Sequence, residues 1–551
     1  MTASGADASA TDTFQKAVAF YGAQRFDEAE ALCIGILAVD PRSIAAKNLL
    51  GAIAMLRGDH TRAAELFGEA AKLAPDVAEL HANRGDALQA LDRPDDALKC
   101  YERALKCDPG NAEVQLKRAM ALHGLEKTAA AEAALTHLLT QHPDTPDAWH
   151  ARGLIRFALG RNEDALGDYD RALALSPDRV DIHAARAETL EALDRRTDAR
   201  AALEKTLALA PDRDDTREQL FNLHLSETTS SPELDRLTAA VAQTTATRDT
   251  EHLIHDRATF DFRLLHDLEQ TAHLIARGIT FDGLREAHAA LTAAFVRLGE
   301  TPTGKSVSLT DAEIAAIAAA RRVTIRHPVP RLPGSALNPA LDWTAIEDSY
   351  FSQRTELAVI DNFLSPEALT QLRDFALLST IWRREYTNQY IGAFAQHGFV
   401  GPLHMQIAEE LQQKMPRIFA QHRLHQLWGF KYASTRAAKG IGVHADFARV
   451  NLNFWITPDE ANLDPTSGGM VIYDVPAPKT WGFKEYNVDH RRIYAFLKKN
   501  RATAQTLPYR SNRAVLFNST LFHETDTIRF KEGYENRRVN VTYLFGRGLK
   551  M

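Results

Sequence analysis

Six prolines recur every 34 residues in the first part of the chain, at Pro41, Pro75, Pro109, Pro143, Pro177 and Pro211. Twelve residues before each proline lies an alanine, at Ala29, Ala63, Ala97, Ala131, Ala165 and Ala199. A second small residue lies twelve positions earlier again, at Ala17, Gly51, Gly85, Ala119, Gly153 and Ala187. Self-similarity at a fixed period of this length is typical of repeat architectures, which stack small helical units.

The pattern resembles the tetratricopeptide repeat, a helix-turn-helix unit of 34 residues. Small residues let two helices approach closely, and proline ends each unit because it cannot continue a helix. Residues 146–179 form the best unit, with Trp149, Gly153 and Tyr169 in phase, followed by residues 78–111. We therefore expect an all-α solenoid over residues 1–213 whose concave groove binds a peptide or protein. The alternative is that the array only packs or dimerises.

After Pro211 the period stops, although apolar residues keep helical spacing over 252–279 and 283–299, and a third such run opens at Asp311. We interpret residues 214–325 as a helical spacer. Its scattered histidines have irregular spacing, which favours packed or solvated side chains over a metal site. Residues 326–354 begin with several prolines, including Pro328, Pro330 and Pro333, and are expected to form a linker at a domain boundary.

Composition limits the classes of function. A chain of 551 residues suits about three domains at roughly 150 residues each. The net charge of −7 argues against a general nucleic-acid or membrane-surface binder, since such proteins usually carry a basic patch. The three cysteines do not suggest a disulfide framework. Without a signal-peptide pattern or a long apolar run, the expectation is a cytoplasmic protein, and its oligomeric state is not readable.

From residue 355 onward the sequence changes from alanine-rich helices to strands. Helices are expected over about 365–378, where Ser365 and Pro366 supply the start signals, and over 402–417. Strand candidates follow at 427–433, 441–447, 450–457, 469–475, 513–518, 521–530 and 537–546. Two helices before seven or eight strands predict a double-stranded β-helix, a jelly roll of the cupin kind with flanking helices, over residues 355–551. The predicted fold class is therefore multidomain.

One constellation in this region predicts a metal centre. His444 and Asp446 are two residues apart, so on a strand over 441–447 they would point to the same face. His523 would reach the same ion from a second strand. Two histidines and one carboxylate are the ligand set of a non-haem Fe(II) oxygenase, which leaves coordination positions open.

With these ligands in place, residues 355–547 resemble the Fe(II)- and 2-oxoglutarate-dependent dioxygenases of the prolyl-4-hydroxylase-like branch. The likeness is carried by residues 359–365, His444-Ala445-Asp446, Ser467-Gly468-Gly469, residues 512–517 leading to Phe522-His523-Glu524, and Arg538-Val539-Asn540. An isolated His-x-Asp is weak, but this ordered combination is specific.

The resemblance implies that a basic residue holds the distal carboxylate of 2-oxoglutarate, which suits a guanidinium. Arg538 is the first choice, with Asn540 on the same strand face, while Arg529 and Arg537 are rivals. It also implies that Tyr432 hydrogen-bonds the cosubstrate, although a core tyrosine is equally plausible. Asn451 and Asn453 alternate with apolar residues and are expected to line the cavity, and residues 481–492 form a long insertion that either covers the substrate or is a solvated loop.

The resemblance implies an enzyme that uses Fe(II), 2-oxoglutarate and O₂, with ascorbate as a further candidate cofactor. Because Asp446 keeps the metal carboxylate, hydroxylation is favoured over halogenation. The leading hypothesis is hydroxylation of a peptide or protein side chain, prolyl or other, recruited by the repeats. The alternatives are an oxygenase acting on a small or carrier-bound molecule, and a repeat scaffold with an inactive oxygenase domain.

Overall fold

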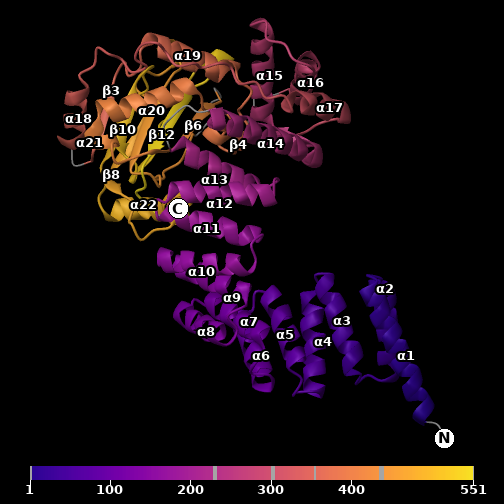
Figure 1. Cartoon of the computed structure of the whole chain (residues 1–551). Helices are drawn as coiled ribbons and strands as arrows, with labels where there is room; N and C mark the ends of the chain where they lie inside the picture. The colour runs from indigo at the N-terminus through magenta and orange to yellow at the C-terminus, as the bar shows by residue number, and fades with distance from the viewer. Residues whose placement is uncertain (1–2, 227–231, 300–304, 353–354, 434–439, 550–551) are drawn as a thin grey trace. The chain divides into compact units, whose positions relative to one another are not determined.

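The computed structural model describes residues 3–226, 232–299, 305–352, 355–433 and 440–549. The chain divides into two compact units, Met1–Asp212 and Arg213–Met551 (Figure 1). Within the described ranges, no helix combines the length and apolar character needed to span a membrane.

The first unit is an array of paired helices. The first members of the pairs are α1 (Ala3–Gly22), α3 (Ile44–Leu56), α5 (Ala78–Ala90), α7 (Ala112–Gly124), α9 (Pro146–Ala158) and α11 (Val180–Ala192). The second members are α2 (Phe26–Val39), α4 (His60–Leu73), α6 (Pro94–Cys107), α8 (Thr128–Gln141), α10 (Asn162–Leu175) and α12 (Arg196–Leu209). Each second helix ends two residues before one of the periodic prolines, which stop the helix because proline cannot continue it.

Close contact between the helices of a pair explains the periodic small residues. A Cβ atom added to Gly85 would lie 2.5 Å from the ring of Tyr101, and one added to Gly153 would lie 2.5 Å from the ring of Tyr169. The periodic alanines Ala97 and Ala165 are completely buried. The spacing seen in the sequence therefore reflects steric limits at the contact between the two helices.

The second unit begins with helices α13 (Asp214–Leu225), α14 (Pro232–Asp256), α15 (Asp261–Ala276), α16 (Leu284–Leu298) and α17 (Asp311–Arg321). The continuous helix predicted over 252–279 is wrong. Arg257 has a φ of 54°, which ends α14, and β1 (Ala258–Phe260) then pairs with β2 (Ser306–Ser308) before α15 starts. Backbone pairing with a distant segment overrides the apolar periodicity here.

The proline-containing segment at 326–354, expected to be a linker, is held against the rest of the second unit. It contains α18 (Trp343–Ser352), and Leu337 forms a β-bridge with Leu364. The amide of Leu332 donates to Oε1 of Gln406 at 2.8 Å, and the amide of Ala336 donates to Oε1 of Glu410 at 2.9 Å. Both acceptors belong to α20 (Pro402–Lys414).

Two antiparallel sheets follow. The seven-stranded sheet has the order β3-β10-β7-β12-β6-β5-β4, and the three-stranded sheet has the order β11-β8-β9. The strands are β3 (Leu357–Ile360), β4 (Arg384–Tyr386), β5 (Tyr390–Phe394), β6 (Leu424–Tyr432), β7 (Val450–Trp455), β8 (Met470–Pro476), β9 (Ala504–Leu507), β10 (Ala514–Asn518), β11 (Leu521–Thr525) and β12 (Val539–Phe545). The remaining helices are α19 (Pro366–Leu378), α21 (Pro416–Phe419) and α22 (His490–Lys499).

The predicted strand over 441–447 is not regular. His444 makes one isolated antiparallel bridge with His523. The amide of Ala445 instead donates to the carbonyl oxygen of Tyr486, and the amide of Asp446 donates to that of Ser519. Successive amides therefore find acceptors on three different segments, so the segment is extended without joining a ladder.

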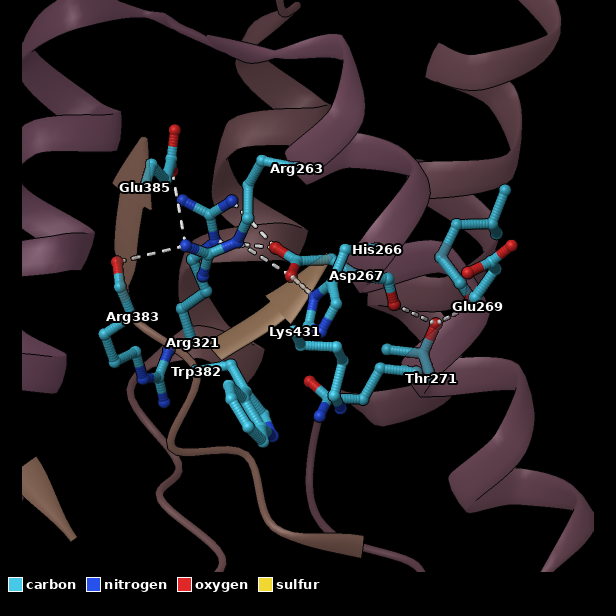
Figure 2. A network of polar contacts seen from close by, with 12 residues as sticks. Arg263, His266, Asp267, Glu269, Thr271, Arg321, Trp382, Arg383, Glu385 and Lys431 are labelled. Atoms are coloured by element: carbon cyan, nitrogen blue, oxygen red, sulfur yellow. Dashed lines mark hydrogen bonds and ion pairs between the residues drawn. The ribbon is translucent and has the colours of Figure 1, made fainter. Parts of the chain in front are cut away.

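A buried polar network connects α15 to the seven-stranded sheet (Figure 2). Arg263 donates to one oxygen of Asp267 at 2.8 Å, and Arg321 donates to the other at 2.8 Å. Burial opposes ionisation of Asp267, but these two guanidiniums outweigh it and hold its pKa well below the usual value. Beside it, Lys431 of β6 donates to Oη of Tyr534, which also accepts from Gln270 of α15. Through Tyr534, which bonds both Gln270 and Lys431, the network holds α15 against β6.

Candidate metal centre

Two histidines face each other across the isolated bridge. The amide of His444 donates to the carbonyl oxygen of His523 at 2.9 Å, and the amide of His523 donates to that of His444 at 2.8 Å. Their ring centres lie 4.3 Å apart. This backbone pairing brings together two imidazoles that are distant in sequence.

Asp446 completes the group. Its carboxylate oxygens lie 3.9 Å from Nε2 of His444 and 3.4 Å from Nε2 of His523. The three candidate ligand atoms all lie within 4.8 Å of one another. Asp446 and His523 are 8% and 4% exposed, so the charge of the carboxylate is largely removed from water. Such a cluster is costly unless a cation or hydrogen bonds compensate it.

Both histidines are oriented by backbone carbonyl groups. Nδ1 of His444 donates to the carbonyl oxygen of Gly442 at 2.8 Å, and Nδ1 of His523 donates to that of Leu521 at 2.9 Å. A carbonyl oxygen only accepts, so Nδ1 of each ring carries a proton, and Nε2 of each ring faces Asp446. Burial lowers the pKa of His444 to about 4, which keeps the ring neutral near pH 7. Neutral imidazoles with free Nε2 atoms are suited to binding a metal.

Asn451 of β7 orients the carboxylate. Its Nδ2 donates to Oδ2 of Asp446 at 2.8 Å, and the asparagine is completely buried. Oδ2 also lies 3.4 Å from Nε2 of His523, while Oδ1 lies 3.9 Å from Nε2 of His444, so each carboxylate oxygen faces one histidine. Contacts of this kind to the outer side of a ligand tune metal affinity.

The three residues share a cavity with the predicted cosubstrate residues Arg538, Tyr432 and Asn540. The other lining residues are Trp428, Phe430, Ile441, Asn451, Asn453, Met470, Glu524, Thr525 and Thr542. They come mainly from β6, β7, β11 and β12. The guanidinium of Arg538, the side-chain amides of the asparagines and the group of His444, Asp446 and His523 therefore line the same cavity.

Arg538 is buried without an acidic partner. Its Nε donates to the carbonyl oxygen of Gly468 at 2.6 Å and its Nη2 to that of Gly469 at 3.0 Å, and its guanidinium lies 4.7 Å from the centre of the Tyr432 ring. Within the described part of the chain, no carboxylate lies within 4.0 Å of this guanidinium. Burial lowers the pKa of Arg538 below its usual value, so an anion entering the cavity would relieve an uncompensated charge.

Polar groups beside Arg538 form a chain along the cavity wall. Nη1 of Arg538 lies 3.5 Å from Oδ1 of Asn540, whose Nδ2 contacts Oδ1 of Asn453 at 3.4 Å. Asn453 in turn donates to Thr542 at 3.0 Å. Burial raises the pKa of Tyr432, so its hydroxyl remains a hydrogen-bond donor. These groups can hold the polar atoms of a small acid.

The rival arginines lie elsewhere. Arg529 is exposed and is not one of the described residues that line the cavity, so it is not placed to bind a cosubstrate there. Arg537 is buried, but its Nε donates to Glu269 at 2.6 Å and it does not line the cavity. The two arginines are adjacent just before β12 but have different partners, Glu269 for Arg537 and the carbonyl oxygens of Gly468 and Gly469 for Arg538.

Family comparisons concern the first unit. A tetratricopeptide repeat model matches residues 78–111, and a second model of the same description matches residues 14–78, 116–180 and 150–214. The N-terminal part of this chain is a tetratricopeptide-repeat array. No curated protein matches the chain significantly.

Several solved repeat structures are similar to part of the chain. PilW, described as a widely conserved type IV pilus biogenesis factor, is 22% identical with a TM-score of 0.36, and the match covers 38% of this chain and 98% of PilW. YrrB, described as a repeat protein with an unusual peptide-binding site, is 16% identical with a TM-score of 0.29 over 34% of this chain and 96% of YrrB. A repeat protein from Parabacteroides merdae is 16% identical with a TM-score of 0.37 over 42% and 91%.

The tetratricopeptide-repeat array contains an in-phase set of arginines that is readable in the sequence but was not predicted. Each precedes the periodic small residue: Arg84, Arg118, Arg152 and Arg186. Arg152 forms a bidentate pair with buried Asp168 of α10, and Arg186 pairs with Asp170 of the same helix. These two arginines therefore contact the helix array itself, and they contribute to its packing.

Sequence reasoning also missed part of the cavity wall. Trp428 and Phe430 lie on β6 at two-residue intervals before Tyr432, so all three share a face and line the cavity. That alternation was available in the sequence. The carbonyl groups of Gly442 and Leu521 had no side-chain signal, because any residue type can supply a backbone acceptor.

Proposed function

We propose that the second unit is an Fe(II)- and 2-oxoglutarate-dependent oxygenase that hydroxylates a side chain of a peptide or protein. The observation that carries the proposal is the unpaired, buried Arg538 in the same cavity as His444, Asp446 and His523. A metal ligand set alone fits many ions. A metal ligand set beside an uncompensated guanidinium fits a chelating cosubstrate with a second carboxylate.

The strand order supports a double-stranded β-helix. After β6, the extended segments pass back and forth between the two sheets. Residues around His444 lie against β11, and β7 joins the large sheet. Strands β8 and β9 then pair in the small sheet, β10 joins the large sheet, β11 the small one and β12 the large one. This order is the one expected for a jelly roll whose two sheets face each other. The candidate ligands then lie on the segments of the smaller sheet.

The residues present fit the proposed groups. His444, Asp446 and His523 would hold Fe(II), because one ligand atom from each of two imidazoles and a carboxylate lie within 4.8 Å of one another. Arg538 would bind the distal carboxylate of 2-oxoglutarate, and Tyr432 would donate a hydrogen bond. Trp428 and Phe430 would exclude water from the cavity wall. Bound Fe(II) supplies the redox chemistry that couples oxidation of 2-oxoglutarate to succinate and CO₂ with insertion of oxygen from O₂ into a substrate C–H bond.

The tetratricopeptide-repeat array supports a polypeptide substrate, since such arrays generally bind peptides or proteins. In this proposal the array recruits the substrate and the second unit modifies it. Deleting residues 1–212 tests the assignment, because the two units are each compact. Modification of a protein substrate should then fall sharply, whereas turnover of a free small molecule would persist.

Succinate formation tests the enzymatic part. Purified full-length protein supplied with Fe(II), 2-oxoglutarate and O₂ should form succinate, and His444→Ala should abolish the metal-dependent rate. Equal succinate from the wild-type and His444→Ala proteins would contradict the proposal. Near-identical circular dichroism of the two proteins would show that the variant is folded.

A further inference from the structure

The insertion between β8 and β9 contains a concentration of positive charge. Residues 479–501 hold seven lysines and arginines and two acids, a net charge of +5 in a chain whose total is −7. The rest of the chain therefore carries −12. The seven cations are all exposed: Lys479, Lys484, Arg491, Arg492, Lys498, Lys499 and Arg501. We call this set the basic face.

The acids of the insertion do not neutralise the basic face. Glu485 pairs with Arg492 at 2.7 Å, and Asp489 caps the start of α22 by accepting from the amide of Arg492. Among the residues that the structure describes, the other six cations have no acidic oxygen within 4.0 Å. The positive charge is therefore available to a partner.

Folding requirements do not explain this charge. Helix α22 needs only one face for the core, where Ile493 and Leu497 are buried, and its other face is free to carry any polar residue. Arg491 and Arg492 lie in the first turn, where the helix dipole disfavours cations. Exposed apolar side chains accompany the charges: Phe483, Val488 and Tyr494 are 47%, 57% and 48% exposed. Basic and apolar groups together are typical of a binding surface.

The insertion also contacts the segment that carries the candidate ligands His444 and Asp446. The carbonyl oxygen of Tyr486 accepts from the amide of Ala445, Nδ2 of Asn487 donates to the carbonyl oxygen of Ala445, and Nδ1 of His490 bonds the carbonyl oxygen of Val443. Oη of Tyr494 donates to Glu524, which lines the cavity. A molecule bound to the basic face would therefore lie next to the segment that carries His444 and Asp446.

We infer that the basic face docks an acidic polypeptide segment beside the cavity. Charge complementarity selects an acidic partner, and the exposed apolar side chains favour one with interspersed apolar residues. A nucleic acid is a long polyanion that would extend over the acidic remainder of the surface. Insertion of α22 into a membrane is disfavoured because its apolar face is already buried in the core. The inference rests on the proposed function only in taking the docked segment as part of the substrate.

A binding assay with full-length protein tests the docking surface without turnover. The probe is a fluorescein-labelled 20-residue peptide of repeated Glu-Glu-Ala-Phe, measured by anisotropy at low salt. The test variant neutralises Arg491, Lys498 and Lys499 with glutamine. The matched control neutralises Arg285, Arg322 and Lys531, which are exposed in the same unit and have no ion pair there with a described residue.

The inference predicts that the test variant binds the probe at least about tenfold more weakly, while the control variant stays within about twofold of wild type. Equal binding by both variants would overturn it, as would tighter wild-type binding to a 20-nucleotide oligothymidylate or to phosphatidylserine vesicles than to the peptide. Because the assay needs neither metal nor 2-oxoglutarate, its failure would leave the succinate test of the oxygenase unaffected.

Discussion

The guanidinium of Arg538 lies 4.7 Å from the centre of the Tyr432 ring, and both side chains line the cavity that contains His444, Asp446 and His523. The arginine is held by the carbonyl groups of Gly468 and Gly469 rather than by an acid. The carbonyl groups therefore fix the position of the guanidinium, but no carboxylate among the described residues balances its positive charge. An anion that binds there gains a preoriented, desolvated partner.

Replacing Arg538 with glutamine should raise the KM for 2-oxoglutarate about 100-fold, because a charge-assisted pair to the distal carboxylate is lost. Succinate formation at varied 2-oxoglutarate measures the effect. Arg529→Gln is the control, since Arg529 is exposed and does not line the cavity. A large KM increase in Arg529→Gln with none in Arg538→Gln would reverse the assignment.

Asn451→Ala should weaken metal binding about 10-fold or more, because the 2.8 Å hydrogen bond that orients Asp446 is removed. Calorimetric titration with Mn²⁺ measures the affinity without turnover. Asn453→Ala is the matched variant, since Asn453 lies two residues further along β7 and bonds Thr542 instead. Equal Mn²⁺ affinities in both variants would exclude a positioning role for Asn451.

In the tetratricopeptide-repeat array, Gly153→Ala should destabilise the first unit by about 1–2 kcal/mol. The new methyl group would lie 2.5 Å from the completely buried ring of Tyr169, so the cost of overpacking exceeds the gain in helix propensity. Gly167→Ala in neighbouring α10 meets nothing within 4 Å and should stabilise by up to about 1 kcal/mol. Urea unfolding of both variants measures these changes. If the unfolding free energies of the two variants change in the same direction, the steric explanation is contradicted.

His404 should make the second unit sensitive to acid. Its ring is fully buried against Phe375 and Phe399, and neither ring nitrogen has a hydrogen-bond partner among the described residues. Burial lowers its pKa from 6.5 to about 3. Between these values the unfolded chain binds a proton that the folded chain does not, so stability falls as pH drops below 6.5.

By pH 5 this single group should cost about 2 kcal/mol of unfolding free energy. His404→Phe keeps an aromatic ring but removes the titrating group, so it should lose less stability than wild type between pH 7.5 and pH 5. Urea unfolding at the two pH values measures the difference. An identical loss in both proteins would show that His404 does not titrate as its burial requires.

Local signals made the repeat array predictable. The periodic prolines and small residues act within one helix pair, as Gly85 and Tyr101 illustrate, so a short stretch of sequence contains the information. The helix starting after Ser365 was predicted for the same reason, because the Ser365 side chain accepts from the amide of Ala368.

The second unit was harder to predict, because its site depends on contacts between segments that are distant in the sequence. The ligand residues were chosen from the sequence, but the strand expected around His444 is a single bridge whose other amides bond Tyr486 and Ser519. The choice between Arg538 and Arg529 depends on the carbonyl groups of Gly468 and Gly469, which carry no side-chain signal. Helix α22 was not predicted, since only residues 481–492 were considered, and these as an insertion, although Ile493 and Leu497 have the four-residue spacing of a buried helix face.

Anaerobic calorimetric titration of 2-oxoglutarate into metal-loaded full-length protein tests the central claim, that a metal centre and a cosubstrate site share one cavity. Wild type loaded with Fe(II) should bind one 2-oxoglutarate per chain, and binding should be lost without metal and in His523→Ala. Equal binding of 2-oxoglutarate with and without metal, or to His523→Ala, would contradict the claim.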